Sequence, residues 1–150
     1  MPITRRLAAS AAALLLTVST VFAATPQEEA NRKLVLEFYE RVLNQKDADA
    51  ATQYIGSSYK QHNPRVPDGV AALQGFVRST KERSPQSKSV VKRSFAEGDH
   101  VILHVHATSS PEDRGVAIVD IFRLENGKIV EHWDVIQPVP ETAANGNTMF

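Results

Sequence analysis

The sequence predicts an α+β fold in which helices come first and antiparallel strands follow. Apolar residues recur about every four positions between residues 26 and 45, which is typical of a helix. From residue 88 onward the apolar pattern has a period of two, which is typical of strands. Because the linkers between these strands are short, the strands form a meander, and helices pack on one face of the sheet.

The first 23 residues have the pattern of a secretory signal peptide. Arg5 and Arg6 precede the apolar run LAASAAALLLTVSTVFA, and Val21 and Ala23 stand at the small-residue positions before a cleavage site. A transmembrane anchor is the alternative, although the run is short and rich in Ala, Ser and Thr. The paired arginines leave both the general secretory route and the twin-arginine route open. We therefore expect a periplasmic or secreted protein whose mature chain is one domain, residues 24–150.

Charge and cysteine content exclude several classes of function. The chain has 17 basic and 17 acidic residues, and removal of Arg5 and Arg6 leaves 15 against 17, a net charge near −2. This balance argues against a nucleic-acid partner and against binding of the mature chain to a membrane. Cysteine is absent, which excludes disulfides, thiolate metal ligands and a cysteine nucleophile. The chain also has neither a Gly-x-Ser-x-Gly elbow nor a phosphate-binding glycine loop.

Three helices are predicted before the strands. Thr25, Pro26 and Glu28 form a capping-box pattern, which starts a helix that runs to about residue 45. Asp47 is expected to cap a short helix through residue 54, and Asp68 to start a third helix that ends near residue 82. Between them, the segment KQHNPRVPDG contains two prolines and a glycine, so it is a strand end or a loop.

Four strands are predicted at residues 88–96, 100–108, 116–125 and 128–137. The linker ENGK contains the pair Asn126–Gly127, which favours a tight type I′ hairpin between the last two strands. The tail, residues 138–150, is expected to be loosely ordered.

Both faces of these strands are largely apolar. Val101 and Leu103 alternate with Ile102 and His104, although one layer of helices covers only one face of a sheet. The second apolar face therefore predicts a ligand pocket or a subunit interface, and with Trp133 on the outer face we expect a homodimer. The ionisable residues that fall on these apolar faces are His104, His106, Asp120, His132 and Asp134.

The segment VEHWDVIQP holds the most informative of these residues. Strand alternation places His132 and Asp134 on the same face as Val130 and Ile136. A buried carboxylate is costly unless it is paired or neutralised. We therefore interpret this strand as lining a pocket, with Asp134 as the principal acid–base group. The alternative is that Asp134 is neutral or forms a structural ion pair with Arg123 or a helix residue, and that His132 only satisfies a backbone group.

The motifs YKQHNP and VDIFRLENGKIVEHWDVIQ resemble SnoaL-like proteins of the nuclear-transport-factor-two-like superfamily, over residues 27–138. The resemblance implies a cone-shaped, cystatin-like α+β barrel, in which N-terminal helices and a curved antiparallel sheet enclose an apolar cavity, often in a homodimer. Relatives include polyketide cyclases that perform intramolecular aldol condensations, ketosteroid isomerases and limonene epoxide hydrolases.

The resemblance also implies roles for particular residues. Asp134 occupies the last-strand position where epoxide-hydrolase relatives place a catalytic aspartate, and Asp120 resembles the aspartate of their preceding strand. Those relatives have an arginine where this chain has Ile118, which disfavours epoxide opening. His62 resembles a polar residue near the pocket mouth of cyclase relatives. The catalytic candidates are thus Asp134, His132, Asp120 and His62, and the substrate-binding candidates are His104, Tyr59, Asn63, Ile118, Phe122 and Ile136.

A metal site is a further hypothesis. His104 and His106 lie two apart on a strand and could share one ion with Asp120 or Asp134. The alternative is that one histidine faces the pocket while the other lies near the strand end in solvent. Because the resembling families act without a metal, we expect no metal and no cofactor.

Two classes of function remain. The first is a cofactor-independent lyase or isomerase, which uses an Asp/His acid–base pair for aldol-type condensation or isomerisation of a small apolar carbonyl compound. The second is a non-catalytic exported binding protein for a small apolar ligand, because the same cavity would suffice for sequestration.

Overall fold

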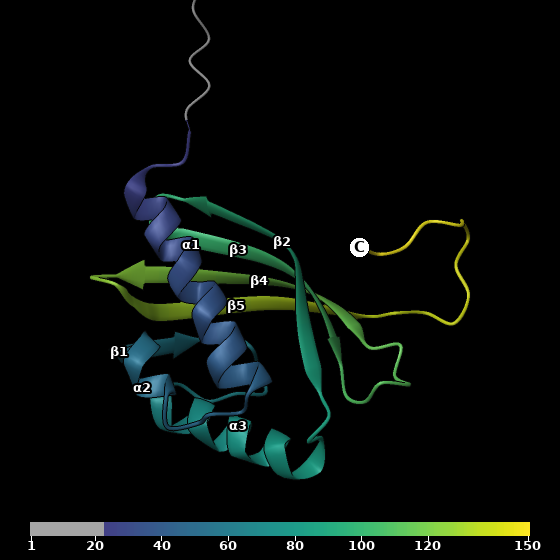
Figure 1. Ribbon diagram of the computed structural model, residues 1–150. Helices are drawn as coiled ribbons and strands as arrows, with labels where there is room; N and C mark the ends of the chain where they lie inside the picture. Colours follow the sequence, from purple (N-terminus) through teal and green to yellow (C-terminus); the bar gives the residue numbers. More distant parts are fainter. Residues whose placement is uncertain (1–22) are drawn as a thin grey trace, which may run out of the picture.

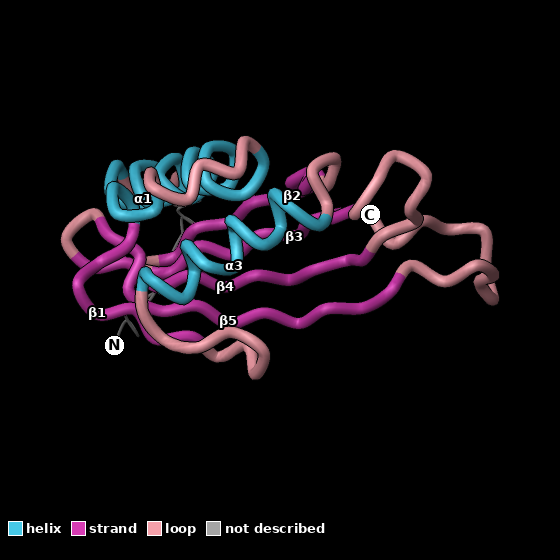
Figure 2. Tube along the Cα trace, turned by 90° about the horizontal axis from the view of Figure 1, so that it is seen from below, coloured by secondary structure: helices cyan, strands magenta, loops and turns pink. Residues whose placement is uncertain are grey.

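The computed structural model describes residues 23–150, so nearly all of the predicted signal segment lies outside the described residues. A layer of helices covers one face of a five-stranded sheet with the strand order β1-β5-β4-β3-β2 (Figure 1). Figure 2 shows α1 and α3 on the same side of the strands. The predicted α+β class is confirmed.

The elements follow one another in the predicted order of helices first and strands afterwards, apart from one early strand. They are α1 (Pro26–Phe38), a π-helical continuation η1 (Tyr39–Asn44), α2 (Ala51–Tyr54), β1 (Ile55–Gln61), α3 (Val70–Arg83), β2 (Lys88–Glu97), β3 (His100–Thr108), β4 (Val116–Glu125) and β5 (Lys128–Pro138). No helix within residues 23–150 is both long and apolar enough to cross a lipid bilayer.

Side-chain hydrogen bonds confirm the predicted start of the first helix, whereas the predicted cap of the second helix by Asp47 is wrong. The backbone N–H of Glu28 donates to Thr25 Oγ1 at 3.2 Å, and the backbone N–H of Thr25 donates to Glu28 Oε2 at 2.7 Å, which completes the capping box. Helix α2 begins at Ala51, with Ala50 at the N-cap position and no side-chain cap, and Asp47 Oδ1 instead accepts the backbone N–H of Ala50 at 3.1 Å in the turn before the helix. The contacts of the capping box join residues three apart in the chain, which is why the sequence predicts them.

The third helix begins at Val70 rather than at Asp68, which corrects the prediction. Asp68 accepts the backbone N–H of Gln61 at 2.8 Å, so its carboxylate ties the loop to the end of β1 instead of capping α3. Gly69, with φ of 91°, makes the turn into the helix, a conformation that disfavours residues with a Cβ.

The sheet is mixed rather than wholly antiparallel, because β1 pairs with β5 in parallel. The sequence analysis missed β1, since its segment IGSSYKQ has a glycine and two serines where strands usually carry β-branched or aromatic residues. The four predicted strands are confirmed to within one residue at each end. In the hairpin between β4 and β5, Asn126 and Gly127 have φ of 50° and 70°, as a type I′ turn requires.

The core lies between α1 and the inner face of the sheet. Val35, Phe38 and Val42 from the helical layer pack against Val101 and Leu103 of β3, and all five are at most 2% exposed. Burial of each such side chain contributes about 1.5–3 kcal/mol. A bulge in β2 between Val91 and Arg93 accompanies the bend of this strand in Figure 1.

The outer face of the sheet is apolar, as predicted, and no helix of the described chain covers it. Phe95, Ile102, Val119 and Val135 are all exposed there, and Val135 retains 71% of its accessible surface. The tail after β5 turns back toward the sheet, where the Phe150 ring packs against the rings of His104 and His106.

Gly115 and Gly98 both lie in turns next to β-strands, but they differ in the space available to a side chain. Both have positive φ, 75° and 58°, but a Cβ on Gly115 would lie 2.1 Å from the backbone oxygen of Ala107, whereas a Cβ on Gly98 meets nothing within 4 Å. We expect Gly98→Ala to lower the free energy of unfolding by about 1–2 kcal/mol and Gly115→Ala to lower it by more. Urea unfolding of both variants measures the difference. Equal losses would show that the contact with Ala107 relaxes freely.

Candidate functional site

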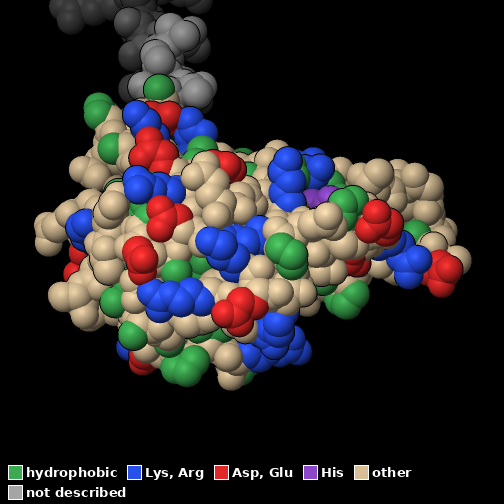
Figure 3. Space-filling view, turned by 60° about the horizontal axis from the view of Figure 1, so that its bottom comes forward, with side chains coloured by type: hydrophobic (Ala, Val, Ile, Leu, Met, Phe, Trp, Pro, Cys, Tyr) green, Lys and Arg blue, Asp and Glu red, His purple; other side chains and the backbone are tan. Residues whose placement is uncertain are grey.

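A cavity of about 340 Å³ lies between α3 and the inner face of the sheet. Apolar side chains form much of its wall, among them Leu73, Phe76 and Val77 of α3 and Ile118 and Phe122 of β4. The outer surface differs, because basic and acidic side chains lie interspersed over the face shown in Figure 3. The charged side chains that line the cavity are Arg65, Lys88, Asp120 and Asp134.

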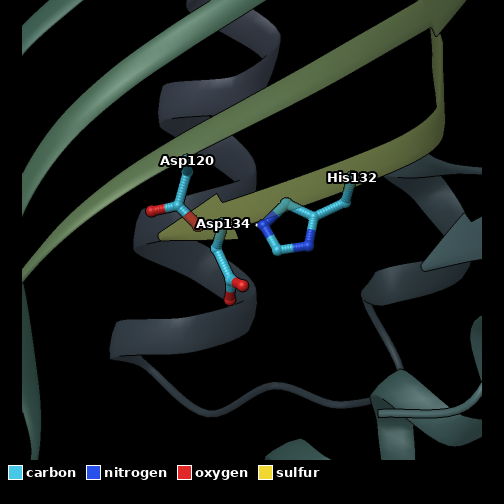
Figure 4. Close-up of side chains that lie close together, drawn as sticks. All are labelled: Asp120, His132 and Asp134. Atoms are coloured by element: carbon cyan, nitrogen blue, oxygen red, sulfur yellow. Dashed lines mark hydrogen bonds and ion pairs between the residues drawn. The ribbon is translucent and has the colours of Figure 1, made fainter. Parts of the chain in front are cut away.

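Two carboxylates and one imidazole meet inside this cavity (Figure 4). Asp120 of β4 and Asp134 of β5 are directly opposite each other in the antiparallel ladder, so both side chains leave the same face of the sheet. His132 lies two residues before Asp134 and shares that face. One ligand atom from each of the three side chains lies within 4.8 Å of the other two.

The His132 ring is held at both nitrogens. Its Nδ1 lies 2.7 Å from Gln61 Oε1, and its Nε2 lies 2.9 Å from Asp120 Oδ1. Because Gln61 Oε1 also accepts the backbone N–H of Asn63 at 3.0 Å, this atom is the amide oxygen, and Nδ1 of His132 must donate to it. His132 Nε2 and Asp120 Oδ1 therefore share one proton, either as imidazolium and carboxylate or as imidazole and carboxylic acid.

Asp120 is almost fully buried, with 4% of its surface exposed, and both of its oxygens are engaged. The hydroxyl of Tyr39 donates to Asp120 Oδ2 at 2.5 Å, while His132 occupies Oδ1. Burial raises the pKa of Tyr39 well above its ordinary value, and the charge of Asp120 adds to this effect. Tyr39 thus remains a neutral donor across the physiological range.

Asp134 has a different environment. It is half-buried, and its Oδ2 accepts a hydrogen bond from Asn63 Nδ2 at 2.6 Å. Among residues 23–150, its other oxygen has no hydrogen-bond or ion-pair partner. Asp134 therefore has a lone pair free to act on a bound molecule, whereas the oxygens of Asp120 are both occupied.

Tyr59 of β1 supplies a further donor to the cavity. It is 5% exposed, and its oxygen accepts a weak hydrogen bond from Gln61 Nε2 at 3.3 Å. In the described part of the chain its hydroxyl hydrogen has no acceptor. Burial, followed by the charge of Asp120, raises the pKa of Tyr59, so its hydroxyl stays protonated and able to donate.

A family model of SnoaL-like polyketide cyclases matches residues 33–143. The chain belongs to this family. No curated protein matches the chain. Among solved structures, a candidate SnoaL-like polyketide cyclase from Jannaschia sp. CCS1 is 19% identical with a TM-score of 0.64, over 77% of this chain and 90% of that one. A candidate ketosteroid isomerase from Kribbella flavida is 16% identical with a TM-score of 0.63, over 79% and 86%.

A third structure is a nuclear-transport-factor-two-like protein of unknown function from Cytophaga hutchinsonii. It is 25% identical with a TM-score of 0.60, over 72% of this chain and 90% of that one. These structures support the fold of the SnoaL-like chain, and the predicted resemblance is confirmed.

Most of the predicted site residues of this SnoaL-like protein lie together, although the structure does not test their roles. The cavity is lined by Asp120, His132, Asp134, Tyr59, Asn63, Ile118, Phe122 and Ile136. The predicted alternative for Asp134, an ion pair with Arg123, is wrong, because Arg123 pairs with Glu125 and Glu131 instead. His132 contacts side chains and not only a backbone group.

His104 and His62 do not line the cavity, which corrects both placements. On β3, Leu103 pairs with Asp120 on the inner face, so its neighbour His104 projects from the outer face, where its Nδ1 lies 3.0 Å from Arg93. His62 stacks on Trp133, with ring centroids 4.6 Å apart.

The metal hypothesis for His104 and His106 is wrong for the same reason. Both histidines project from the face opposite Asp120 and Asp134, so they cannot share an ion with those carboxylates.

Tyr39 and Gln61 are the site residues that sequence reasoning missed. Tyr39 lies in the apolar stripe of the first helix, and it was predicted only to pack in the core. A buried phenol needs a hydrogen-bond partner, which is the signal that could have identified it. Gln61 lies within the YKQHNP motif, but only the unrecognised strand β1 brings it to His132.

The two buried tyrosines predict how stability changes at alkaline pH. Their pKa values are higher in the folded than in the unfolded chain, so their contribution is fully present below about pH 10 and is lost as the pH rises through the folded-state values. Tyr39→Phe should be less stable near neutral pH, because Asp120 loses a donor, but should show a shallower alkaline decline. Urea unfolding from about pH 8 to about pH 11 measures both effects. Parallel pH profiles for the variant and the wild type would contradict this assignment.

Proposed function

We propose that this chain is a small-molecule enzyme that uses acid–base chemistry for aldol-type condensation or isomerisation of a small carbonyl compound. The observation that carries the proposal is the convergence of Asp120, His132 and Asp134 inside an otherwise largely apolar cavity. An apolar cavity with a few convergent polar groups suits a small organic molecule. Membership of a family named for polyketide cyclases supports the same class of chemistry.

Asp134 is the proposed base. Removal of a proton from the carbon beside a carbonyl needs a lone pair that can reach the substrate. Asp134 has one oxygen held by Asn63 and one oxygen without a partner among residues 23–150, while it remains only half-buried beside the cavity. Asp120 would have to lose its hydrogen bond with Tyr39 or with His132 before it could accept a proton from the substrate. The hydrogen bond from Asn63 fixes the direction of the carboxylate without consuming the oxygen that acts.

Tyr59 is the proposed donor to the oxygen of the substrate. As Asp134 takes the proton, negative charge moves onto the carbonyl oxygen, and a preorganised donor stabilises it. The Tyr59 hydroxyl is buried, protonated and without an acceptor in the described residues, so a carbonyl oxygen can take that position. The enolate carbon then either attacks a second carbonyl of the substrate or recovers a proton at another carbon.

His132 and Asp120 form a proton reservoir beside this pair. One proton lies between His132 Nε2 and Asp120 Oδ1, and Tyr39 and Gln61 hold the outer sides of both groups. In a condensation, the attacked carbonyl becomes an alkoxide and needs a proton. We assign its delivery to His132 Nε2, since the ring lines the cavity, and this transfer requires the contact of Nε2 with Asp120 Oδ1 to open.

Asp134→Asn tests the assignment of the base. Deuterium incorporation beside the carbonyl of cyclohexanone, followed by NMR in heavy water, reports proton removal without knowledge of the natural substrate. The variant should lower the enzymatic rate by about 100-fold, with the melting temperature unchanged or raised because a costly carboxylate is removed. Asp49→Asn, at an exposed surface ion pair, is the matched control and should leave the rate unchanged. A destabilised Asp134→Asn variant with the wild-type rate would contradict the assignment.

The binding-protein alternative is favoured by a different observation. Phe76 and Ile136 line the cavity but remain 47% and 45% exposed, so the cavity has an apolar rim that could hold a ligand without reaction. The pH dependence separates the two functions. A general base gives a sigmoid limb in the exchange rate, whereas apolar sequestration gives nearly flat binding with no exchange.

We also propose that two copies of the chain pair through the outer sheet face. The exposed residues Val119 and Val135 form part of an apolar surface there, and such surfaces commonly mark interfaces. Light scattering should show a dimer that the double variant Val119→Glu, Val135→Glu converts to a monomer. Ala30→Glu, on the exposed side of α1, is the control and should leave the mass unchanged. A monomeric wild type at micromolar concentration would refute the interface.

Export to the periplasm or the medium is likewise a proposal, and it rests on residues 1–23. Val21 and Ala23 fit the cleavage site better than an alternative that places bulky Phe22 three residues before the cut. The exported protein should therefore begin at Ala24, which intact-mass spectrometry measures. An exported protein whose mass includes Arg5 and Arg6 would contradict the proposal.

A further inference from the structure

No lysine or arginine of the described chain forms an ion pair with Asp120 or Asp134, although Arg65 and Lys88 line the same cavity. Asp120 pairs only with His132, and Asp134 pairs with no cation. Arg123, on the same strand as Asp120, points to the outer face and pairs there with Glu131. Because His132 and Asp120 share one proton, the cluster carries a net charge of −1 when Asp134 is ionised, and a divalent ion that replaces this proton neutralises it.

We propose that Asp120, His132 and Asp134 bind one divalent transition-metal ion of the type represented by Zn²⁺. His132 Nε2 and Asp120 Oδ1 lie 2.9 Å apart. An ion about 2.1 Å from each atom would have an angle of about 90° between them, which suits neighbouring ligands of a five- or six-coordinate ion. The hydrogen bond directs Nε2 toward Oδ1, so the ring or the carboxylate has to turn by about 45° before both atoms point to the ion, which then replaces the shared proton.

Asp134 can complete this set with a small movement. The three ligand atoms lie within 4.8 Å of one another, and two atoms bound to one such ion can be up to about 4.2 Å apart. The carboxylate of Asp134 therefore has to approach by less than about 1 Å. It is half-buried, and its oxygen without a partner in the described chain can bind the ion while Asn63 keeps its hydrogen bond to the other oxygen.

Each of the three ligands is oriented by a neutral outer partner, as in many metal sites. Gln61 holds Nδ1 of His132 as the donor and leaves Nε2 for the ion. The Tyr39 hydroxyl holds Asp120. Asn63 Nδ2 holds Asp134.

The hydroxyl of Tyr59 is an independent indication of a ligand at this position. Tyr59 is 95% buried and lines the same cavity, its hydroxyl hydrogen has no acceptor among residues 23–150, and burial, followed by the charge of Asp120, raises its pKa. A water or an anion bound to the ion at the cavity side would accept this hydrogen. The cavity leaves coordination positions open, which is typical of catalytic rather than structural metal sites.

The donor set decides which metals fit. One imidazole nitrogen and two carboxylates suit Zn²⁺, Co²⁺, Mn²⁺ or Fe²⁺, whereas Ca²⁺ and Mg²⁺ prefer oxygen ligands alone and more of them. Binding does not depend on the proposed reaction. A consequence that rests on the proposed function is inhibition, because an ion on Asp134 occupies the lone pair that removes the proton.

Titration calorimetry of the tag-free, chelator-treated protein with zinc sulfate tests the site. We expect one ion per chain with micromolar or tighter affinity. Asp134→Asn and His132→Gln should each weaken binding by at least tenfold. The double variant His104→Asn, His106→Asn is the matched control, because it removes the two neighbouring imidazoles of the outer face and should leave the affinity unchanged. The Co²⁺ absorption spectrum should show a five- or six-coordinate ion in the wild type and change in Asp134→Asn.

Absence of stoichiometric binding would overturn the proposal, as would binding that only the His104/His106 variant abolishes. Should His132→Gln not fold, Asp134→Asn decides alone, since this half-buried side chain is replaced by an isosteric one. Deuterium exchange of cyclohexanone is measured separately on the metal-free protein. Zinc binding without exchange activity would therefore refute only the proposed function, and exchange without zinc binding would refute only the metal site.

Discussion

The contact between Asp120 and His132 is the constraint on which the rest of the site depends. Both side chains are buried, at 4% and 8% exposure, and each would be costly to bury without a hydrogen-bond partner. Their contact explains why polar residues can occupy the inner face of two neighbouring strands. The cavity lies beside this contact, since Asp120 and His132 line it, and the packed apolar core lies next to it.

The strand β1 holds this contact in place from the edge of the sheet. It pairs in parallel with β5, which brings Gln61 opposite His132 and the following residues along the same edge. Gln61 and Asn63 bond to His132 and Asp134 inside the cavity, while His62 between them packs against Trp133 and Glu131 on the outer face. Residues 61–63 thus contact side chains on both faces of β5, and these contacts limit the movement of His132 and Asp134.

The two carboxylates differ in environment although they lie opposite each other. Asp120 is enclosed and fully hydrogen-bonded, whereas Asp134 is half-buried with a free oxygen beside the cavity. A fully satisfied group stabilises the arrangement, and a partly satisfied group remains available to a ligand. The cavity therefore contains one carboxylate that is held in place, Asp120, and one that is available to a ligand, Asp134. In the two proposals above, a proton and a metal ion compete for the free oxygen of Asp134.

The sequence by itself determined the features that depend on near neighbours in the chain. The capping box at Thr25, the turn at Asn126 and the bounds of four strands involve residues a few positions apart, so local pattern sufficed. Alternation also placed His132 with Asp134. Only the tertiary structure decided which face of each strand meets the helices, because alternation defines two faces and does not say which one is covered. For that reason His104 was assigned to the cavity but lies outside it, and Tyr39, 81 residues from Asp120 in the chain, became its partner.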